Sequence, residues 1–102
     1  MSKPPYPQGI SRLLAKAGFE KAGTHRGVTS EGFHVMRYRL QAGVVIVNWW
    51  AASDAEFDRA QHNAMLSSYA DTLTEAGYSA YIRDDQIGRP DHVIVTAGED
   101  TP

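Results

Sequence analysis

Asp58 and His62 are four residues apart, a spacing that puts both side chains on one face of a helix. A carboxylate beside an imidazole can orient the ring for acid–base work or help to hold a metal ion. A metal site normally needs a third ligand, and no spacing in the chain aligns one with this pair. We therefore predict that the two side chains are solvated neighbours, and we assign no metal, cofactor or catalytic residue.

The run RDDQIGRPDH (83–92) gathers acidic, basic and imidazole side chains around one loop. Two carboxylates can share acid–base work when their surroundings push their pKa values apart. No nucleophile motif and no glycine-rich phosphate-binding motif accompanies the run. We interpret Asp84–His92 as a polar hairpin loop with local aspartate turns. A small enzyme that uses this loop is our third hypothesis for the function.

The composition narrows the class of protein. A chain of 102 residues with 42% hydrophobic and 22% charged residues is typical of one globular domain with a modest core. The formal charge of −2 argues against a dedicated polyanion binder. The chain has no cysteine, so disulfides and sulfur-ligated metals play no part.

The ends of the chain are expected to be less ordered than the middle. We expect one domain over residues 1–102, with flexible residues 1–8 and 98–102. Three prolines in the first nine residues predict an extended arm. The longest apolar stretch, Ala42–Ala52, is too short to cross a bilayer, and the start lacks a signal-peptide pattern. We expect a cytoplasmic protein with no membrane partner.

Two segments have the apolar periodicity of helices, and a glycine closes each. Ser53 with Glu56 forms a capping-box pattern, which predicts that the second helix begins there. The predicted stripes are Ile10, Leu13, Leu14 and Ala17, closed by Gly18, and Phe57, Ala60, Ala64, Met65, Tyr69, Leu73 and Ala76, closed by Gly77.

The remaining apolar segments alternate or are rich in β-branched residues, as strands are. The predicted strands are residues 19–25, 32–40, 44–51, 78–84 and 92–97, and residues 26–32 are predicted to be a loop. The element order is α-β-β-β-α-β-β. Consecutive strands favour hairpins, so we predict an α+β fold. Its antiparallel sheet has four or five strands, with the second helix across one face.

The sequence contains a weak internal echo. LAKAGFEKA (14–22) and LTEAGYSAY (73–81) share a leucine, an Ala-Gly pair and an aromatic residue. Both segments read as a helix end followed by a strand. Internal duplication is one explanation, and convergence on glycine at helix ends is the other.

Trp49 and Trp50 must point to opposite faces of a sheet, because successive strand residues alternate. If Ala42 and Gly43 form a two-residue turn, the inner face pairs Leu40 with Val45, Tyr38 with Val47 and Met36 with Trp49. On this register, the reverse face carries Phe33, Val35, Arg37, Arg39, Ile46, Asn48 and Trp50.

The reverse face could serve in several ways. Tryptophan and arginine are enriched at protein interfaces, and Arg37, Arg39 and Trp50 could instead hold nucleic-acid bases. The first helix or the amino-terminal arm could also cover this face, or it could form a small-molecule pocket. We favour a non-enzymatic interaction module that self-associates, or docks a protein partner, through this outer hairpin face. Nucleic-acid binding is the alternative.

Two segments of the chain resemble a known group of proteins. ISRLLAKAGFEKAG (10–23) and AQHNAMLSSYADTLTEAGY (60–78) are similar to segments of small uncharacterised proteins of high-GC actinobacteria and their mobile elements. The resemblance implies a bacterial or phage origin. It implies no activity and no functional residue.

Overall fold

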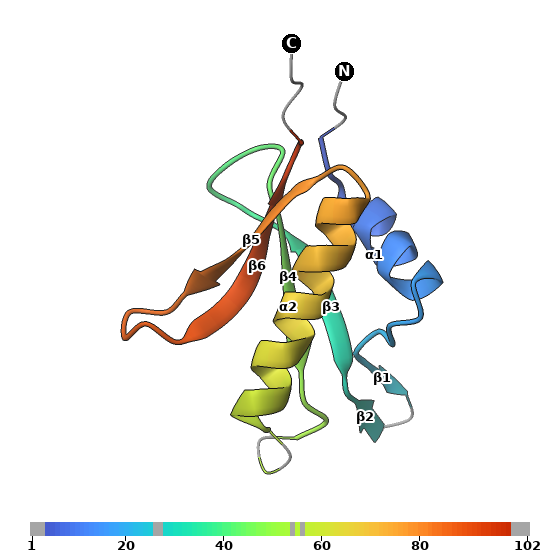
Figure 1. The fold of residues 1–102 in the computed structure, drawn as a ribbon. Coiled ribbons are helices and arrows are strands. Elements are labelled where there is room, and N and C mark those ends of the chain that lie inside the picture. The colour runs from blue at the N-terminus through green and yellow to red at the C-terminus, as the bar shows by residue number, and fades with distance from the viewer. Residues whose placement is uncertain (1–3, 26–27, 54, 56, 99–102) are drawn as a thin grey trace.

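The computed structural model describes residues 4–25, 28–53, 55 and 57–98, and its two helices pack on one face of an antiparallel sheet (Figure 1). The elements are α1 (Pro7–Lys16), β1 (Gly23–His25), β2 (Val28–Ser30), β3 (Gly32–Arg37), β4 (Val45–Trp50), α2 (Arg59–Glu75), β5 (Ser79–Asp84) and β6 (Pro90–Thr96). The sheet has the strand order β3-β4-β6-β5. The predicted α+β class with two helices and a four-stranded antiparallel sheet is confirmed.

The sheet is built from two αββ units. α1 precedes the β3–β4 hairpin and α2 precedes the β5–β6 hairpin, and the second strands of the two hairpins meet at the centre. This seam between β4 and β6 consists of the pairs Val45↔Val95, Ile46↔Ile94 and Val47↔Val93. The repeated topology favours duplication as the source of the echo in the sequence.

Both helices end in the same way, at the glycines that the sequence indicates. Gly18 and Gly77 have φ values of 101° and 99°, a region that residues with a Cβ rarely adopt. After each glycine an aromatic N–H donates to a buried leucine carbonyl, from Phe19 to Leu14 and from Tyr78 to Leu73, at 3.1 Å in both cases. The two segments of the echo therefore form equivalent helix-to-strand connections in the two halves of the fold.

The predicted amino-terminal arm is too long, because α1 already begins at Pro7. A proline at the first helical position loses no hydrogen bond, and its fixed φ suits a helix. Proline therefore starts the helix here instead of preventing it. Ile10 and Leu14 are fully buried in the core, as the stripe predicts.

The predicted start of α2 at Ser53 is wrong. Asp58 is the N-cap, and its Oδ1 accepts from the N–H groups of Ala60 at 2.9 Å and Gln61 at 3.2 Å. Asp58 and Gln61 have the same capping-box spacing as Ser53 and Glu56. The helix begins at Asp58 because the segment with helical periodicity follows it directly. Glu56 lies outside the described residues.

The buried stripe of α2 also differs from the predicted one. Tyr69 and Leu73 are buried as expected, whereas Ala60, Ala64 and Ala76 are exposed. The residues of α2 that are buried are His62, Leu66, Tyr69, Ala70 and Leu73. The histidine replaces the expected apolar residue at the start of the stripe.

The predicted register of the central hairpin is wrong by three residues. β3 and β4 pair Phe33 with Trp49 and Val35 with Val47, and the connection spans residues 38–44 instead of two residues. The longer turn reverses which residues of β3 face inward. It lets Phe33 reach the core, where it is fully buried.

Residues 19–25 and 28–32 form more structure than the sequence predicts. The predicted strand over 19–25 does not join the sheet along its length, and the predicted loop contains β2, which pairs with β1 in a separate hairpin. Before that hairpin the chain passes β3, where Phe33 N–H donates to Glu20 O and Ala22 N–H donates to Phe33 O, both at 2.9 Å.

Candidate functional site

The two neighbouring tryptophans lie on opposite faces of the sheet, as predicted. Trp49 is 2% exposed and belongs to the core between the sheet and the helices. Trp50 is 47% exposed and lies on the other face. The inner partner of Trp49 is Phe33, and not Met36 as the sequence-based register predicts.

An apolar row crosses the open face of the sheet. Cross-strand pairing puts Met36 beside Ile46, Ile46 beside Ile94, and Ile94 beside Tyr81. Met36 is 45% exposed and Tyr81 is 54% exposed, and Ile94 is buried between its neighbours. The row touches all four strands, so it is a feature of the whole sheet and not of the central hairpin alone.

Trp50 forms a second feature of this face. Its ring stacks on the imidazole of His34, with ring centroids 3.7 Å apart and planes 13° apart. Gly32 lies directly across from Trp50, so the indole can lean over an empty position toward His34. Burial, and then the charge of Lys21, lowers the pKa of His34. The stack holds Trp50 in a fixed orientation on the surface.

The structure places only part of the predicted set on the open face. Ile46 and Trp50 project from the outward face of β4, whereas Asn48, at the register position between them, turns its side chain toward His62 of α2. Phe33 and Val35 instead pack on the core side, and Arg37 lines a hollow with Pro4, Pro5, Tyr6 and the turn at residues 42–44. Arg39 lies in the turn after β3.

The outward residues that the sequence missed are His34, Met36, Tyr81, Arg83, His92 and Ile94. A register that places Phe33 opposite Trp49 would have predicted the correct inward face of β3. Two large aromatic side chains opposite each other favour a common face.

Internal cover of the open face is excluded for the described parts of the chain. α1 packs against β3 and α2 through Ile10 and Leu14, which join the core on the helical side. The predicted alternative, in which the first helix covers Trp50, is therefore wrong. The described arm residues lie at the turn after β3.

Asn48 and His62 join the sheet to α2 by a polar contact. β6 leaves β4 after the Val47↔Val93 pair, and Figure 1 shows the β5–β6 hairpin diverging there. The Asn48 side chain can therefore turn toward the helix. Its Oδ1 accepts from Trp49 N–H at 2.8 Å and from His62 Nε2 at 2.9 Å. The prediction that His62 is a solvated partner of Asp58 is wrong, since His62 is only 4% exposed.

Stability should depend on pH through His62. Burial, followed by the charge of Arg59, lowers the pKa of His62 below its ordinary value of 6.5. As the pH falls through 6.5 the unfolded chain takes up a proton that the folded protein resists. The free energy of unfolding should therefore decrease from neutral pH toward the lower folded-state pKa. Urea denaturation at a series of pH values measures this slope.

The variant His62→Gln provides the control for this pH dependence. Glutamine can still donate to Asn48 but does not titrate, so the slope should become shallower. His34→Gln measures the separate share of His34, whose pKa shifts in the same direction. An unchanged slope in His62→Gln would contradict the assignment.

Residues 85–89 form the loop between β5 and β6, whereas Asp84, Asp91 and His92, which the sequence analysis assigns to the loop, lie in the two strands. Asp85 Oδ1 accepts from the N–H groups of Ile87 and Arg89, both at 2.9 Å, and Oδ2 pairs with Arg89 Nε at 3.1 Å. The backbone N–H of Arg89, with smaller contributions from other donors, lowers the pKa of Asp85. Both oxygens of the Asp85 carboxylate are therefore used in hydrogen bonds that stabilise the turn. Asp91 and His92 form a separate surface pair at 2.7 Å.

Within the described ranges, no group of three or more His, Asp or Glu side chains could hold a metal ion. Neither helix, over the same ranges, has both the length and the apolar composition that a membrane-spanning segment needs.

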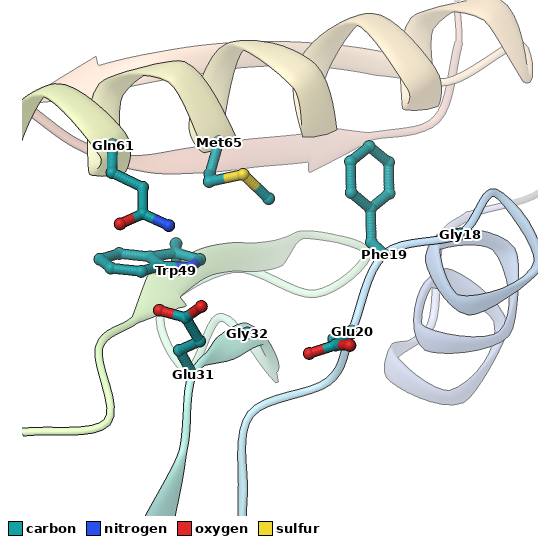
Figure 2. Close-up of a pocket in the computed structure, with 8 residues that line it drawn as sticks. All are labelled: Gly18, Phe19, Glu20, Glu31, Gly32, Trp49, Gln61 and Met65. Carbon is teal, nitrogen blue, oxygen red and sulfur yellow. The ribbon is translucent and has the colours of Figure 1, made fainter.

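A small cleft opens beside Trp49 on the helical side of the sheet. It has a volume of about 220 Å³ and is lined by Gly18, Phe19, Glu20, Glu31, Gly32, Trp49, Gln61 and Met65. Figure 2 shows the indole between Gln61, which comes from α2, and the Glu31 carboxylate. The sequence reasoning missed this cleft because its residues come from four distant segments.

These features define a small α+β protein with an open aromatic sheet face and an acidic cleft beside its core tryptophan. Comparisons with protein families, with curated proteins and with solved structures gave no significant match. The resemblance to actinobacterial proteins therefore stays a prediction.

Proposed function

We propose that this protein is an interaction module that self-associates by stacking the open sheet faces of two copies. The observation that carries the proposal is the apolar row from Met36 to Tyr81, which shares its face of the sheet with the stacked Trp50, four residues along β4 from Ile46. Large exposed apolar patches on a small protein commonly mark an interaction site. Both helices occupy the opposite face, and Met36 and Tyr81, at the two ends of the row, are exposed to solvent.

The composition of this face favours a second copy as its occupant. Arg83 is the one lysine, arginine or acidic residue at the outward positions of the four paired strands. Aromatic and methionine side chains with few charges are typical of the centre of a protein interface. A flat sheet face packs well against another flat face, and a twofold pair of identical copies supplies one.

The size of the face predicts a weak dimer. Four strands at ~4.8 Å spacing and six residues at ~3.3 Å rise give a footprint of roughly 19 by 20 Å. A stable interface buries roughly 800 Å² of each partner, which is more than this face offers. We expect association that depends strongly on protein concentration.

The test is Trp50→Ala with sedimentation velocity over two decades of protein concentration. Each copy of a twofold dimer contributes its own Trp50, so the variant interface loses two aromatic anchors at about 2 kcal/mol each, and dimerisation should weaken roughly a thousandfold. Tyr6→Ala is a matched control, because Tyr6 is exposed to a similar degree but lies in the arm. A wild-type protein that stays monomeric throughout, or equal effects of both variants, would contradict the proposal.

Binding of single-stranded nucleic acid is the competing outcome. Trp50 and Tyr81 could stack bases, and Arg83 and the histidines lie on the same face. Such binding would weaken steeply with salt, whereas an apolar dimer changes little. Binding to an oligonucleotide that disappears at high salt, together with a monomeric protein, would replace the dimer by this alternative.

The proposal retains the expected cytoplasmic location and bacterial origin.

A further inference from the structure

We infer that His62 is a pH-sensitive anchor: its neutral imidazole holds the first turn of α2 between β4 and β6, and protonation in mild acid releases this turn while the rest of the fold stays closed. The release is local, and so differs from the loss of global stability with falling pH. His62 belongs to α2, on the side of the sheet opposite to the open face, so the release does not require the proposed dimer.

β4 and β6 separate next to the first turn of α2. Their last pair is Val47↔Val93, and Figure 1 shows the β5–β6 hairpin diverging from β4 beyond it. The N–H and carbonyl groups of Phe33 bond to the segment before β1, so the opposite residue, Trp49, also directs its backbone N–H away from β3. This N–H therefore points to the side that β6 has left.

Asn48 closes this open edge of β4, and His62 holds Asn48 in place. The Asn48 Oδ1 accepts from Trp49 N–H at 2.8 Å and from His62 Nε2 at 2.9 Å. Because the backbone donor fixes which end of the amide is the oxygen, Nε2 must carry the proton of the neutral ring. A second proton would have to enter at Nδ1, which is buried and has no hydrogen-bond partner among the residues described.

A positive charge from the same helix lies near the imidazole. Arg59 is held there, since its Nη1 donates to Pro90 O at 3.2 Å and its guanidinium lies 5.0 Å from the centre of the Phe57 ring. Burial lowers the pKa of His62 most, and the charge of Arg59 lowers it further. The closed structure therefore disfavours a charged imidazole.

The remaining polar and charged neighbours act in the opposite direction or are engaged elsewhere. Asn63 and Asp91 raise the pKa of His62, each with a smaller effect than burial. The Asp91 carboxylate is paired with His92 at 2.7 Å, and the Asp58 carboxylate caps the helix. β4 contributes no charged side chain. Asp91 therefore lessens the effect of burial without cancelling it.

The first turn of α2 has no other buried side chain to hold it. Residues 57–61 are all exposed, and His62 is the first buried residue of the helix. The other buried residues of α2 lie in its later turns and are Leu66, Tyr69, Ala70 and Leu73. Segments with few buried contacts open at a lower free energy than the core does. Release of His62 can therefore free the first turn while the later turns stay on the sheet.

The direction of the pH response follows from these contacts. Once released, the imidazole is solvated and its pKa returns toward the ordinary value of 6.5. Below this pH the open state takes up a proton that the closed state resists, so opening becomes more frequent as the pH falls. Each pH unit favours opening by up to about tenfold, until the pKa of the closed state is reached.

The test is amide hydrogen exchange, followed by NMR at about pH 7 and about pH 5 and expressed as protection factors, which remove the intrinsic pH dependence of exchange. We expect the protection of the Trp49 amide and of the amides of residues 62–65 to fall about tenfold at the lower pH. It should stay below that of Val47 and Leu73 and be insensitive to low urea, because local opening exposes little surface. Protection that does not change with pH, or one urea dependence shared by all these amides, would overturn the inference.

His62→Gln removes the titrating group. Glutamine can still donate to Asn48 Oδ1, so the first turn should stay closed and its protection should no longer depend on pH. His92→Gln is the matched control, since it removes the other imidazole next to Asp91, and it should keep the wild-type response. A response that persists in His62→Gln, or is lost in His92→Gln, would show that another group is the anchor.

The wild-type protein provides a check that needs no variant. Nitrogen NMR of the imidazole rings shows which ring nitrogen carries the proton at neutral pH. We expect His62 to be neutral with its proton on Nε2, as the contact with Asn48 requires. A proton on Nδ1 alone, or a charged ring at neutral pH, would overturn the inference even if the variant fails to fold.

Discussion

Trp49→Ala is expected to destabilise the protein by about 4 kcal/mol, whereas Trp50→Ala is expected to cost about 1 kcal/mol or less. Trp49 is almost fully buried, and its ring lies near Phe57 and His62, with centroids 6.1 and 6.3 Å away. Removing the indole leaves a cavity that the surrounding side chains of the sheet and α2 cannot fill by relaxing. Trp50 loses mainly its stack on His34.

The measurement is urea denaturation of both variants beside the wild type. A small domain has a total stability of about 5–15 kcal/mol, so the Trp49 variant could lose half of it. Far-ultraviolet circular dichroism without urea shows whether each variant is folded at the start. Equal losses for the two variants would contradict the assignment of one indole to each face.

Gly32→Ala is expected to destabilise the protein by about 3 kcal/mol. Gly32 has φ of 154°, and a Cβ there would collide with the carbonyl oxygen of Glu20 and lie 2.6 Å from Ala22 N. These backbone atoms cannot retreat freely, because Glu20 O and Ala22 N both hydrogen-bond to Phe33. The substitution should also disturb the cleft, which Glu20 and Gly32 both line.

Two other glycines are controls for this substitution. Gly88 has φ of 81° and open space around it, so Gly88→Ala should cost only about 1 kcal/mol for the backbone conformation. A Cβ at Gly23 would meet no atom within 4 Å, and Gly23→Ala should be nearly neutral. Thermal melts of the three variants give the order, and a neutral Gly32→Ala would contradict the close packing.

Local features of the sequence predicted much of the fold. Gly18 and Gly77 marked the helix ends correctly, because a left-handed residue after a helix is a local requirement. The alternation of Trp49 and Trp50 held because side-chain direction in a strand depends only on the pleat. The α+β class followed from the order of such local elements.

Features that depend on contacts between distant residues were predicted poorly. The hairpin register depended on the length of the turn after β3, which the local pattern Ala42-Gly43 does not determine. The error moved Phe33 and Val35 to the wrong face. His62 was taken for a surface residue because its partner, Asn48, is on another element. The cleft required segments that only the tertiary fold brings together.

The seam between β4 and β6 has a consequence for how the chain assembles. Each αββ half is held by contacts between near neighbours in sequence, and the three pairs from Val45↔Val95 to Val47↔Val93 join the halves in the sheet. Closing this long-range seam is entropically costlier than forming either hairpin, so we expect it to close last during folding. Until then both strands display free edges. Two such chains can exchange halves and become trapped as intertwined, domain-swapped dimers.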